Sequence, residues 1–214
     1  ILLETEKQKI YFEKNLHVPS RKCAVIYTGV DDEKFFADTA VPKFPDFTVL
    51  FRGRIVKEAS VPTVLEAAKM LEGKDVQFLI VGFGWDGAMK EFDEAIGRLS
   101  PKNVRHIRKQ VPTSELRDLM LKCHVSLGQF GDHERLSRTI PHKAFESLAM
   151  RIPYVTGRTE GIQELLRDGE NCLMVKVADA KDLAEKILLL KNDSVLYGKL
   201  AEGGYQTYQG RFTP

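Results

Sequence analysis

A proline and a carboxylate share one amphipathic segment, Thr139 to Met150, and together they could hold a ligand that carries phosphates and hydroxyl groups. Pro141 suits the first turn of a helix, because the N–H that it lacks would be unpaired there, and Thr139 is placed to cap the remaining amides. The open amides and the dipole of such a helix attract an anion. Glu146 follows about one turn later and can accept hydrogen bonds from hydroxyl groups. A nucleotide sugar has both features.

Lys143 and Glu146 are three residues apart, so a helix places them on one face. One interpretation is an exposed ion pair, which contributes little to stability. The other is that Glu146 lies at the edge of a buried stripe and turns toward a ligand. The residues that supply this stripe are Ile140, Phe145, Leu148 and Ala149. The spacing alone leaves both interpretations open.

Two glycine-containing segments follow β-rich runs. Gly53 and Arg54 come directly after residues 47–52. Glycine lets the backbone approach a ligand closely, and arginine offers donors that match phosphate oxygens, although a turn glycine beside a surface arginine is the alternative. Gly82-Phe-Gly84 follows the next run, but the third glycine of a dinucleotide-binding fingerprint is absent, which favours a tight turn into a helix. We expect Trp85 to cover an edge of the core.

The loop at residues 128–138 is polar and contains glycine. Its His133, together with His142 in the following segment, invites comparison with metal sites. No carboxylate or cysteine stands at a recognisable ligand spacing from these histidines, so we expect no metal site. The serines near this loop lack the sequence context of a nucleophile, and covalent catalysis is not expected either.

β-rich runs alternate with helical patterns six times along the chain, which predicts a doubly wound, Rossmann-like α/β fold with a parallel sheet of about six strands. The expected strands are 47–52, 76–81, 103–107, 124–127, 153–156 and 172–175. The expected helices are 61–73, 86–98, 113–122, 140–150, 160–167 and 179–192, with a last helix at about 194–208. In such a sheet the ligand lies outside the carboxyl ends of the strands.

The chain is expected to comprise three regions. Residues 1–46 form a leading helix and an extended linker packed on the domain, residues 47–192 form the ligand-binding domain, and residues 193–214 form a terminal helix and tail. The first residue is Ile1 rather than Met, so we expect a piece of a longer protein or a processed chain.

The composition of the 214 residues excludes several classes of function. Lys plus Arg is 32 against 30 for Asp plus Glu, a net charge of +2 that provides no electrostatic footprint for nucleic acid. No apolar run approaches the roughly 18–20 residues that span a bilayer, and nothing in these residues indicates membrane contact. The three cysteines are widely spaced, which favours a reducing, cytoplasmic compartment.

Several of these segments, in this order and spacing, resemble a known family. The matching stretches are Tyr27–Asp31 with Phe35, Phe51–Ile55 with Leu65–Ala68, Phe78–Gly84, Asn103–Val104 with Val111–Pro112, Ile140–Glu146 with Ala149, and Glu164–Asn171. The family is the carboxyl-terminal, donor-binding domain of GT-B glycosyltransferases of group 1 (family 4). The resemblance covers nearly the whole chain.

The resemblance implies the donor-binding half of a retaining glycosyltransferase, inactive alone because the amino-terminal acceptor domain is absent. The donor would be a nucleoside-diphosphate sugar, with no cofactor and no metal, and the acceptor a carbohydrate or lipid-linked molecule held by the absent domain. The protein would be cytoplasmic and would reach the inner face of the membrane, if at all, through that domain.

The resemblance also implies roles for individual residues. Arg54 would bind the diphosphate and stabilise the leaving nucleotide, while Glu146 would accept hydrogen bonds from the ribose; these are the two expected catalytic residues. Gln110 and Val111 would border the base. The remaining expected contacts are Gly53, Gly82, Pro141 and Lys143.

Two departures from the family pattern bear on activity. The family has a lysine five residues after the arginine, where this chain has Ala59, and Lys57 is the expected substitute. The family's second carboxylate, eight residues before Glu146, is Arg138 here, which favours an anionic sugar or an additional phosphate contact. These departures keep open a non-catalytic nucleotide-sugar-binding module. Another enzyme of the same fold, such as an epimerase or a phosphorylase, is the remaining alternative.

Overall fold

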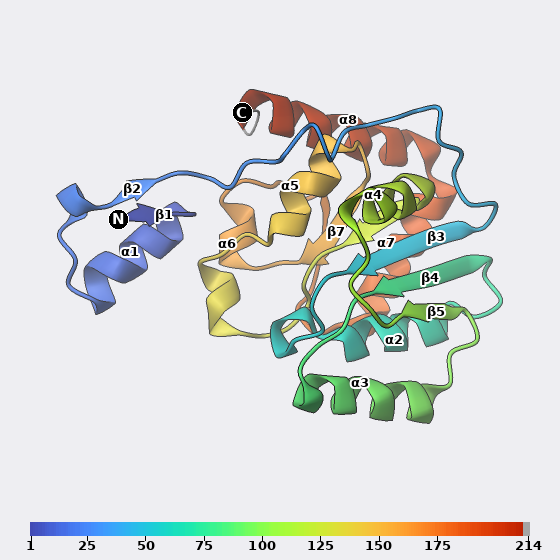
Figure 1. The fold of residues 1–214 in the computed structure, drawn as a ribbon. Coiled ribbons are helices and arrows are strands. Elements are labelled where there is room, and N and C mark those ends of the chain that lie inside the picture. Colours follow the sequence, from blue (N-terminus) through green and yellow to red (C-terminus); the bar gives the residue numbers. More distant parts are fainter. Residues whose placement is uncertain (212–214) are drawn as a thin grey trace.

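A six-stranded parallel sheet with helices on both faces forms the centre of the protein in a computed structural model that describes residues 1–211 (Figure 1). The strands are β3 (Phe47–Arg52), β4 (Val76–Val81), β5 (Val104–Ile107), β6 (Val125–Leu127), β7 (Tyr154–Gly157) and β8 (Leu173–Val175). Their order across the sheet is β5-β4-β3-β6-β7-β8. The predicted doubly wound α/β fold is therefore confirmed.

The strand order places the switch point of the sheet between β3 and β6. The chain runs outward from β3 to β5, then returns to pair β6 with β3 and continues outward to β8. Adjacent crossovers therefore leave in opposite directions at β3 and β6, which opens a crevice beyond their carboxyl ends. The segments that follow these two strands begin at Gly53 and Gly128.

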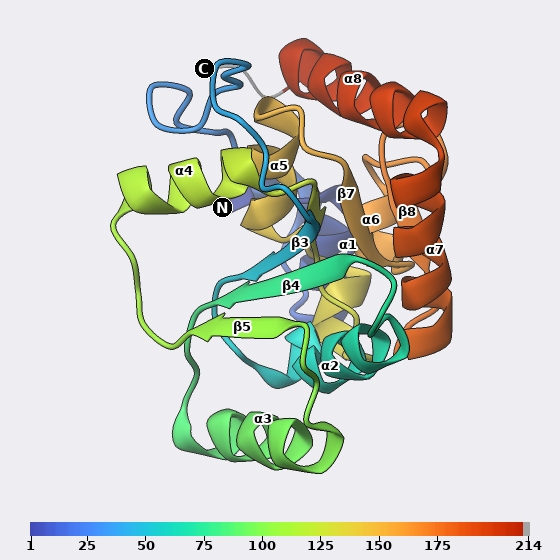
Figure 2. The same cartoon turned by 90° about the vertical axis from the view of Figure 1, so that its right-hand side faces the viewer.

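The helices cover the two faces of the sheet, as the view along the sheet edge in Figure 2 shows. On one face lie α2 (Val61–Met70), α3 (Asp86–Leu99) and α7 (Ala180–Asn192). On the other lie α4 (Thr113–Lys122), α5 (His142–Ala149), α6 (Glu160–Gln163) and part of α8 (Ser194–Arg211). Buried side chains of β3 alternate between the two clusters, Val49 and Phe51 facing one and Leu50 the other, because successive residues of a strand point to opposite faces.

Several helices end or begin at other residues than predicted, as α2 does at Met70 instead of residue 73, and two of them show the reason. The segment expected at 140–150 begins as a helix only at His142, since Pro141 has an extended conformation with ψ 134° and serves as the N-cap. The helix expected at 160–167 is a single turn, and a tighter turn follows it, in which Leu165 and Leu166 both donate to the Ile162 carbonyl. Helix propensity therefore located both elements but not their ends.

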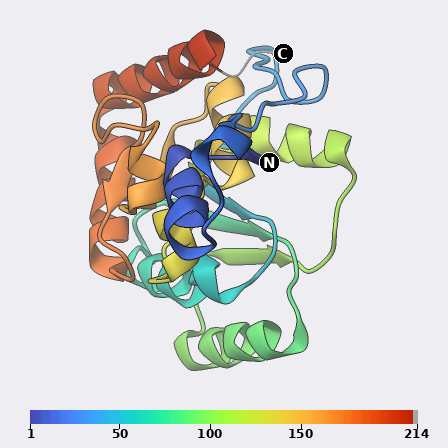
Figure 3. The ribbon, with the colours of Figure 1, turned by 90° about the vertical axis from the view of Figure 1, so that its left-hand side faces the viewer.

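The first residues form a small unit that lies against the side of the domain (Figure 3). Strands β1 (Leu2–Leu3) and β2 (Ala24–Val25) pair in parallel and are connected through α1 (Glu6–Asn15). The backbone amides of Glu6 and Lys7 donate to the Glu164 carboxylate at 2.8 and 3.1 Å. Among the described residues, no helix is both long enough and apolar enough to cross a membrane.

Candidate functional site

Two neighbouring cavities open at the carboxyl ends of the strands and share part of their walls. The strand-end cavity, of about 400 Å³, is bordered by Phe35, Arg54, Gly82, Gln110, Val111 and Leu116. The helix-start cavity, of about 370 Å³, is bordered by Glu58, Arg135, Pro141, His142 and Lys143. Arg52, Gly53 and Glu146 line both cavities. A ligand with two ends could therefore cross from one to the other over Gly53.

Gly53 and Gly82 let the extensions of β3 and β4 run unusually close together. Gly53 has φ +109° and Gly82 has φ +151°, in the region that side chains disfavour. A Cβ atom on Gly82 would lie 1.9 Å from the Gly53 carbonyl oxygen. The two strand extensions are also joined by a hydrogen bond of 2.9 Å from the Gly53 amide to the Val81 carbonyl. Gly82 is thus required by packing between two backbones, and it also borders the strand-end cavity.

Arg54 projects from this junction at the mouth of the strand-end cavity. Its guanidinium lies over the Trp85 ring, 4.9 Å from the ring centroid, which is cation–π geometry. Trp85 is 66% exposed, so the expectation that it covers an edge of the core is wrong. The apolar core beneath α3 is filled by Met89 and Phe92, which leaves the indole outside.

Glu146 is buried, and its carboxylate is held by two side chains. Its Oε2 atom forms an ion pair with the Arg52 guanidinium, and its Oε1 atom lies 3.3 Å from Nδ1 of His142. Burial alone would raise the pKa of this carboxyl, but the hydrogen bond from His142 and the charge of Arg52 outweigh it, so the pKa is lowered. The hydrogen bond to Glu146 correspondingly raises the pKa of His142. The carboxylate is ionised and oriented toward both cavities.

Lys143 does not form the surface ion pair that the helical spacing allowed. Its Nζ atom lies 4.2 Å from the centroid of the Phe51 ring and 3.7 Å from where a Cβ on Gly53 would be. Burial, and then the nearby charge of Arg52, lower the pKa of Lys143 to about 7. The glutamate is instead paired with Arg52.

The first turn of α5 is open toward the helix-start cavity. Thr139 does not cap this helix as predicted, because its Oγ1 atom donates to the Arg135 carbonyl at 3.0 Å. Within residues 1–211 no side chain caps the amides of this turn, and Pro141, His142 and Lys143 all border the cavity. The helix start therefore remains available to an anion, as the sequence suggested.

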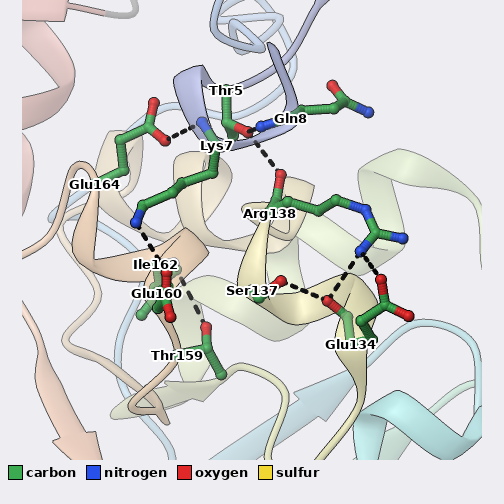
Figure 4. Close-up of polar contacts among 10 residues, drawn as sticks. All are labelled: Thr5, Lys7, Gln8, Glu134, Ser137, Arg138, Thr159, Glu160, Ile162 and Glu164. Carbon is green, nitrogen blue, oxygen red and sulfur yellow. Dashed lines mark hydrogen bonds and ion pairs between the residues drawn. The ribbon is translucent and has the colours of Figure 1, made fainter. Parts of the chain in front are cut away.

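Two predicted contacts, Lys57 and Arg138, lie outside both cavities. Lys57 belongs to a short 3₁₀ turn, Lys57–Ala59, and borders a different cavity beside Pro62. Arg138 turns away to Glu134, with Nη1 2.7 Å from Oε1, and its guanidinium lies 4.0 Å from the Tyr11 ring centroid. Figure 4 shows the contact with Glu134, and it also shows that the Arg138 carbonyl accepts a hydrogen bond from Thr5. The arrangement does not support the sugar or phosphate contact expected of Arg138.

Arg52 was not predicted as a site residue, although it lines both cavities and pairs with Glu146. Its signal in the sequence was an arginine that ends a strand whose other residues are apolar or threonine. A buried arginine needs a buried partner. Its partner lies 94 residues away in the sequence and could not be identified from local patterns. As for metals, no cluster of three or more histidine, cysteine or acidic residues fit to hold an ion is found in the described part of the chain.

The chain belongs to the glycosyl transferases group 1 family, whose model matches residues 32–207. Among curated proteins it is similar to the lipopolysaccharide core biosynthesis glycosyltransferase LpsE of Rhizobium meliloti, at 42% identity over 166 residues. That match covers 77% of this chain and 45% of LpsE. The chain thus spans about half the length of this relative.

Solved structures share the fold at low sequence identity. A structure of HepE from Anabaena in complex with UDP and glucose matches with a TM-score of 0.85 at 17% identity, covering 99% of this chain and 58% of that one. The C-terminal domain of the group 1 glycosyl transferase LpcC from Francisella tularensis matches with a TM-score of 0.70 at 18% identity, covering 86% of this chain and 98% of that one.

Proposed function

We propose that this chain is the donor-binding, carboxyl-terminal half of a retaining family 4 glycosyltransferase that transfers a sugar from a nucleoside-diphosphate sugar. The acceptor, a carbohydrate or a lipid-linked molecule, is held by an amino-terminal domain outside this chain. The observation that carries the proposal is the pair of cavities that meet at Gly53 and Glu146. The family match and the coverage of the LpcC C-terminal domain support it.

The donor lies across the junction of the two cavities. The base occupies the strand-end cavity beside Gln110 and Val111, and the ribose hydroxyls donate to Glu146. An ionised carboxylate can accept further hydrogen bonds while Arg52 and His142 hold it in place. The diphosphate lies over Gly53, and the sugar enters the helix-start cavity.

The chemistry that this half contributes is electrostatic. As the bond between the sugar and the diphosphate breaks, negative charge develops on the departing phosphate oxygen. We infer that Arg54, which borders the strand-end cavity, and the open amides of α5 at the helix-start cavity stabilise this charge. A preorganised donor aimed at developing charge can lower a barrier by about 3–4 kcal/mol. The proposal invokes neither a metal nor a cofactor.

A non-catalytic nucleotide-sugar-binding module is the second candidate, favoured by one observation. Ala59 occupies the position where the resemblance places a phosphate-binding lysine, and it is fully buried. Both candidates require nucleotide binding, but only the first requires transfer when the chain is joined to its acceptor domain.

The proposal is tested by nucleotide binding to the chain. We expect UDP or another nucleoside diphosphate to bind, measured by calorimetry and by the fluorescence of the single tryptophan, Trp85, which lies beside Arg54. Arg54→Ala should weaken binding at least about tenfold, equivalent to about 1.4 kcal/mol. The matched control is Arg98→Ala, which replaces an exposed arginine of α3 that pairs with Glu66 of α2. If UDP, GDP and ADP all fail to bind the wild type, the proposal is wrong.

A further inference from the structure

The first turn of α5 places the Lys143 ammonium group at the helix-start cavity, next to the wall that the two cavities share at Gly53. Lys143 is mostly buried, and its Nζ atom lies close to the Phe51 ring and to Gly53. Gly53 is where the proposed function places the diphosphate. Within residues 1–211, Nζ of Lys143 makes no hydrogen bond, and no carboxylate oxygen lies within 4.0 Å of it.

The groups around Lys143 leave it without a counter-charge of its own. Arg52 on β3 brings a second positive charge, and the Glu146 carboxylate is already engaged by Arg52 and by His142. Across the helix-start cavity, Glu58 faces Arg135, with 3.9 Å between Oε1 and Nη1, and Glu4 is exposed at the rim. Arg54 borders the neighbouring cavity. A protonated Lys143 is therefore a mostly buried cation without a paired carboxylate, and a bound anion would stabilise it.

A second buried atom of this wall also lacks a partner. Nε of Arg52 is buried without a hydrogen-bond acceptor among the described residues. Arg52 is only 6% exposed, and the guanidinium borders both cavities. Buried donors in folded proteins are nearly always paired, so this unpaired nitrogen leaves the Arg52 guanidinium able to donate one more hydrogen bond to a ligand oxygen that reaches it.

We propose, on the basis of the proposed function, that Lys143 supplies the second cation for the donor diphosphate and takes up one proton as the diphosphate binds. Lys143 thus provides from α5 the positive charge that position 59 lacks, because residue 59 is a buried alanine. Lys57 does not fill this role, because it borders a different cavity.

The proton balance of this step is simple. Before binding, burial and the charge of Arg52 disfavour a second cation, so a substantial share of Lys143 is a neutral amine near pH 7. The diphosphate then brings at least two negative charges to Gly53, and Nζ accepts a proton from the solvent to form the ammonium. No other bond forms or breaks. With the pKa of Lys143 at about 7 before the nucleotide binds, a fraction of a proton should be taken up per nucleotide at pH 7 and a larger fraction at pH 8.

The experiment measures UDP and GDP binding to the full chain by calorimetry at pH 7 and pH 8. Each titration is repeated in buffers of different ionisation enthalpy, so that the slope of the apparent enthalpy gives the protons taken up. We expect Lys143→Met to weaken binding at least about tenfold at pH 7 and to abolish the uptake. Lys143→Arg should bind without uptake and with little dependence on pH, because a guanidinium stays protonated.

Two further variants test whether the proton is taken up by Lys143 rather than by a neighbouring group. Lys181→Met, an exposed lysine 3.9 Å from Glu185 on α7, is the matched control and should behave as the wild type does. His142 is the other titratable group in contact with Glu146. If Lys143→Met keeps the uptake and His142→Gln removes it, the proton belongs to the imidazole and the inference is overturned.

Failure of the inference and failure of the proposed function give different results. Wild-type affinity in Lys143→Met at both pH values, with the wild type still binding UDP or GDP, overturns only the role of Lys143. Absence of binding in the wild type overturns the proposed function and this inference with it. A thermal melt of Lys143→Met should show that the variant is folded, because methionine is unbranched like lysine and can pack against the Phe51 ring.

Discussion

Replacing Arg52 by methionine would leave the Glu146 carboxylate buried without its guanidinium partner. Both side chains are less than a tenth exposed, 8% and 9%, so solvent cannot compensate for the loss. Removing one member of a buried ion pair typically costs 3–5 kcal/mol. His142 still donates to the carboxylate in the variant, so we expect a loss of about 3 kcal/mol in the free energy of unfolding at pH 7. For a chain of this length that lowers Tm by about 6–12 °C.

The pH dependence of this loss has a definite sign. In the wild type the pKa of Glu146 is lowered, because the contacts with His142 and Arg52 outweigh burial. The stability that it contributes is therefore present above the ordinary carboxyl pKa of about 4.3 and is lost as the pH falls through the folded value. In Arg52→Met burial remains without the guanidinium, so the pKa of Glu146 rises and the fold favours the protonated acid. The difference between variant and wild type should thus shrink as the pH falls from 7 toward 4.

The assay is urea unfolding at pH 7 and at pH 5, with the double variant Arg52→Met/Glu146→Leu as the companion. Replacing both members by apolar side chains removes the unpaired charge, and the double variant should be more stable than Arg52→Met alone. A double variant less stable than the single one, or an Arg52→Met protein as stable as the wild type, would refute the reasoning.

The remaining predictions concern the strand junction and the ribose contact. Gly82→Ala should lower the free energy of unfolding by at least about 2 kcal/mol, because its Cβ would meet the Gly53 carbonyl at 1.9 Å and φ is +151°. Gly97→Ala, a helical glycine with nothing within 4 Å, should instead stabilise by up to about 1 kcal/mol, and chemical denaturation compares the two. Glu146→Gln should weaken UDP binding at least about tenfold, or 1.4 kcal/mol, in calorimetry; an unchanged Kd would exclude the ribose contact.

Local sequence patterns predicted the sheet closely. The run 76–81 forms β4 with the same bounds, and 47–52 forms β3, because an apolar stretch of that length between turn residues has few other ways to bury itself. Element ends were harder. Pro141, for example, is the N-cap of α5 and not a helical residue, because its backbone is extended. Helix propensity alone did not predict that conformation.

The candidate site was predicted in part, and the difference follows the range of the interactions. Residues directly after a strand, such as Gly53 and Arg54, could be located because chain order places them at the carboxyl edge of the sheet. The direction in which a long side chain points could not be predicted in this way. Arg138 leaves the site because Glu134 and Tyr11 hold its guanidinium, and Tyr11 lies more than a hundred residues earlier.

The sequence by itself determined the family and the fold, together with the edge of the sheet at which a ligand would lie, because these depend on periodicity and on the order of short motifs. Only the tertiary structure determined which charged side chains pair with one another. Arg52 pairs with Glu146, which lies 94 residues later in the sequence. The Lys143 side chain lies beside Gly53 and is mostly buried. The physical reason is that electrostatic partners inside a protein are chosen by proximity and desolvation after folding, and neither is encoded in sequence spacing.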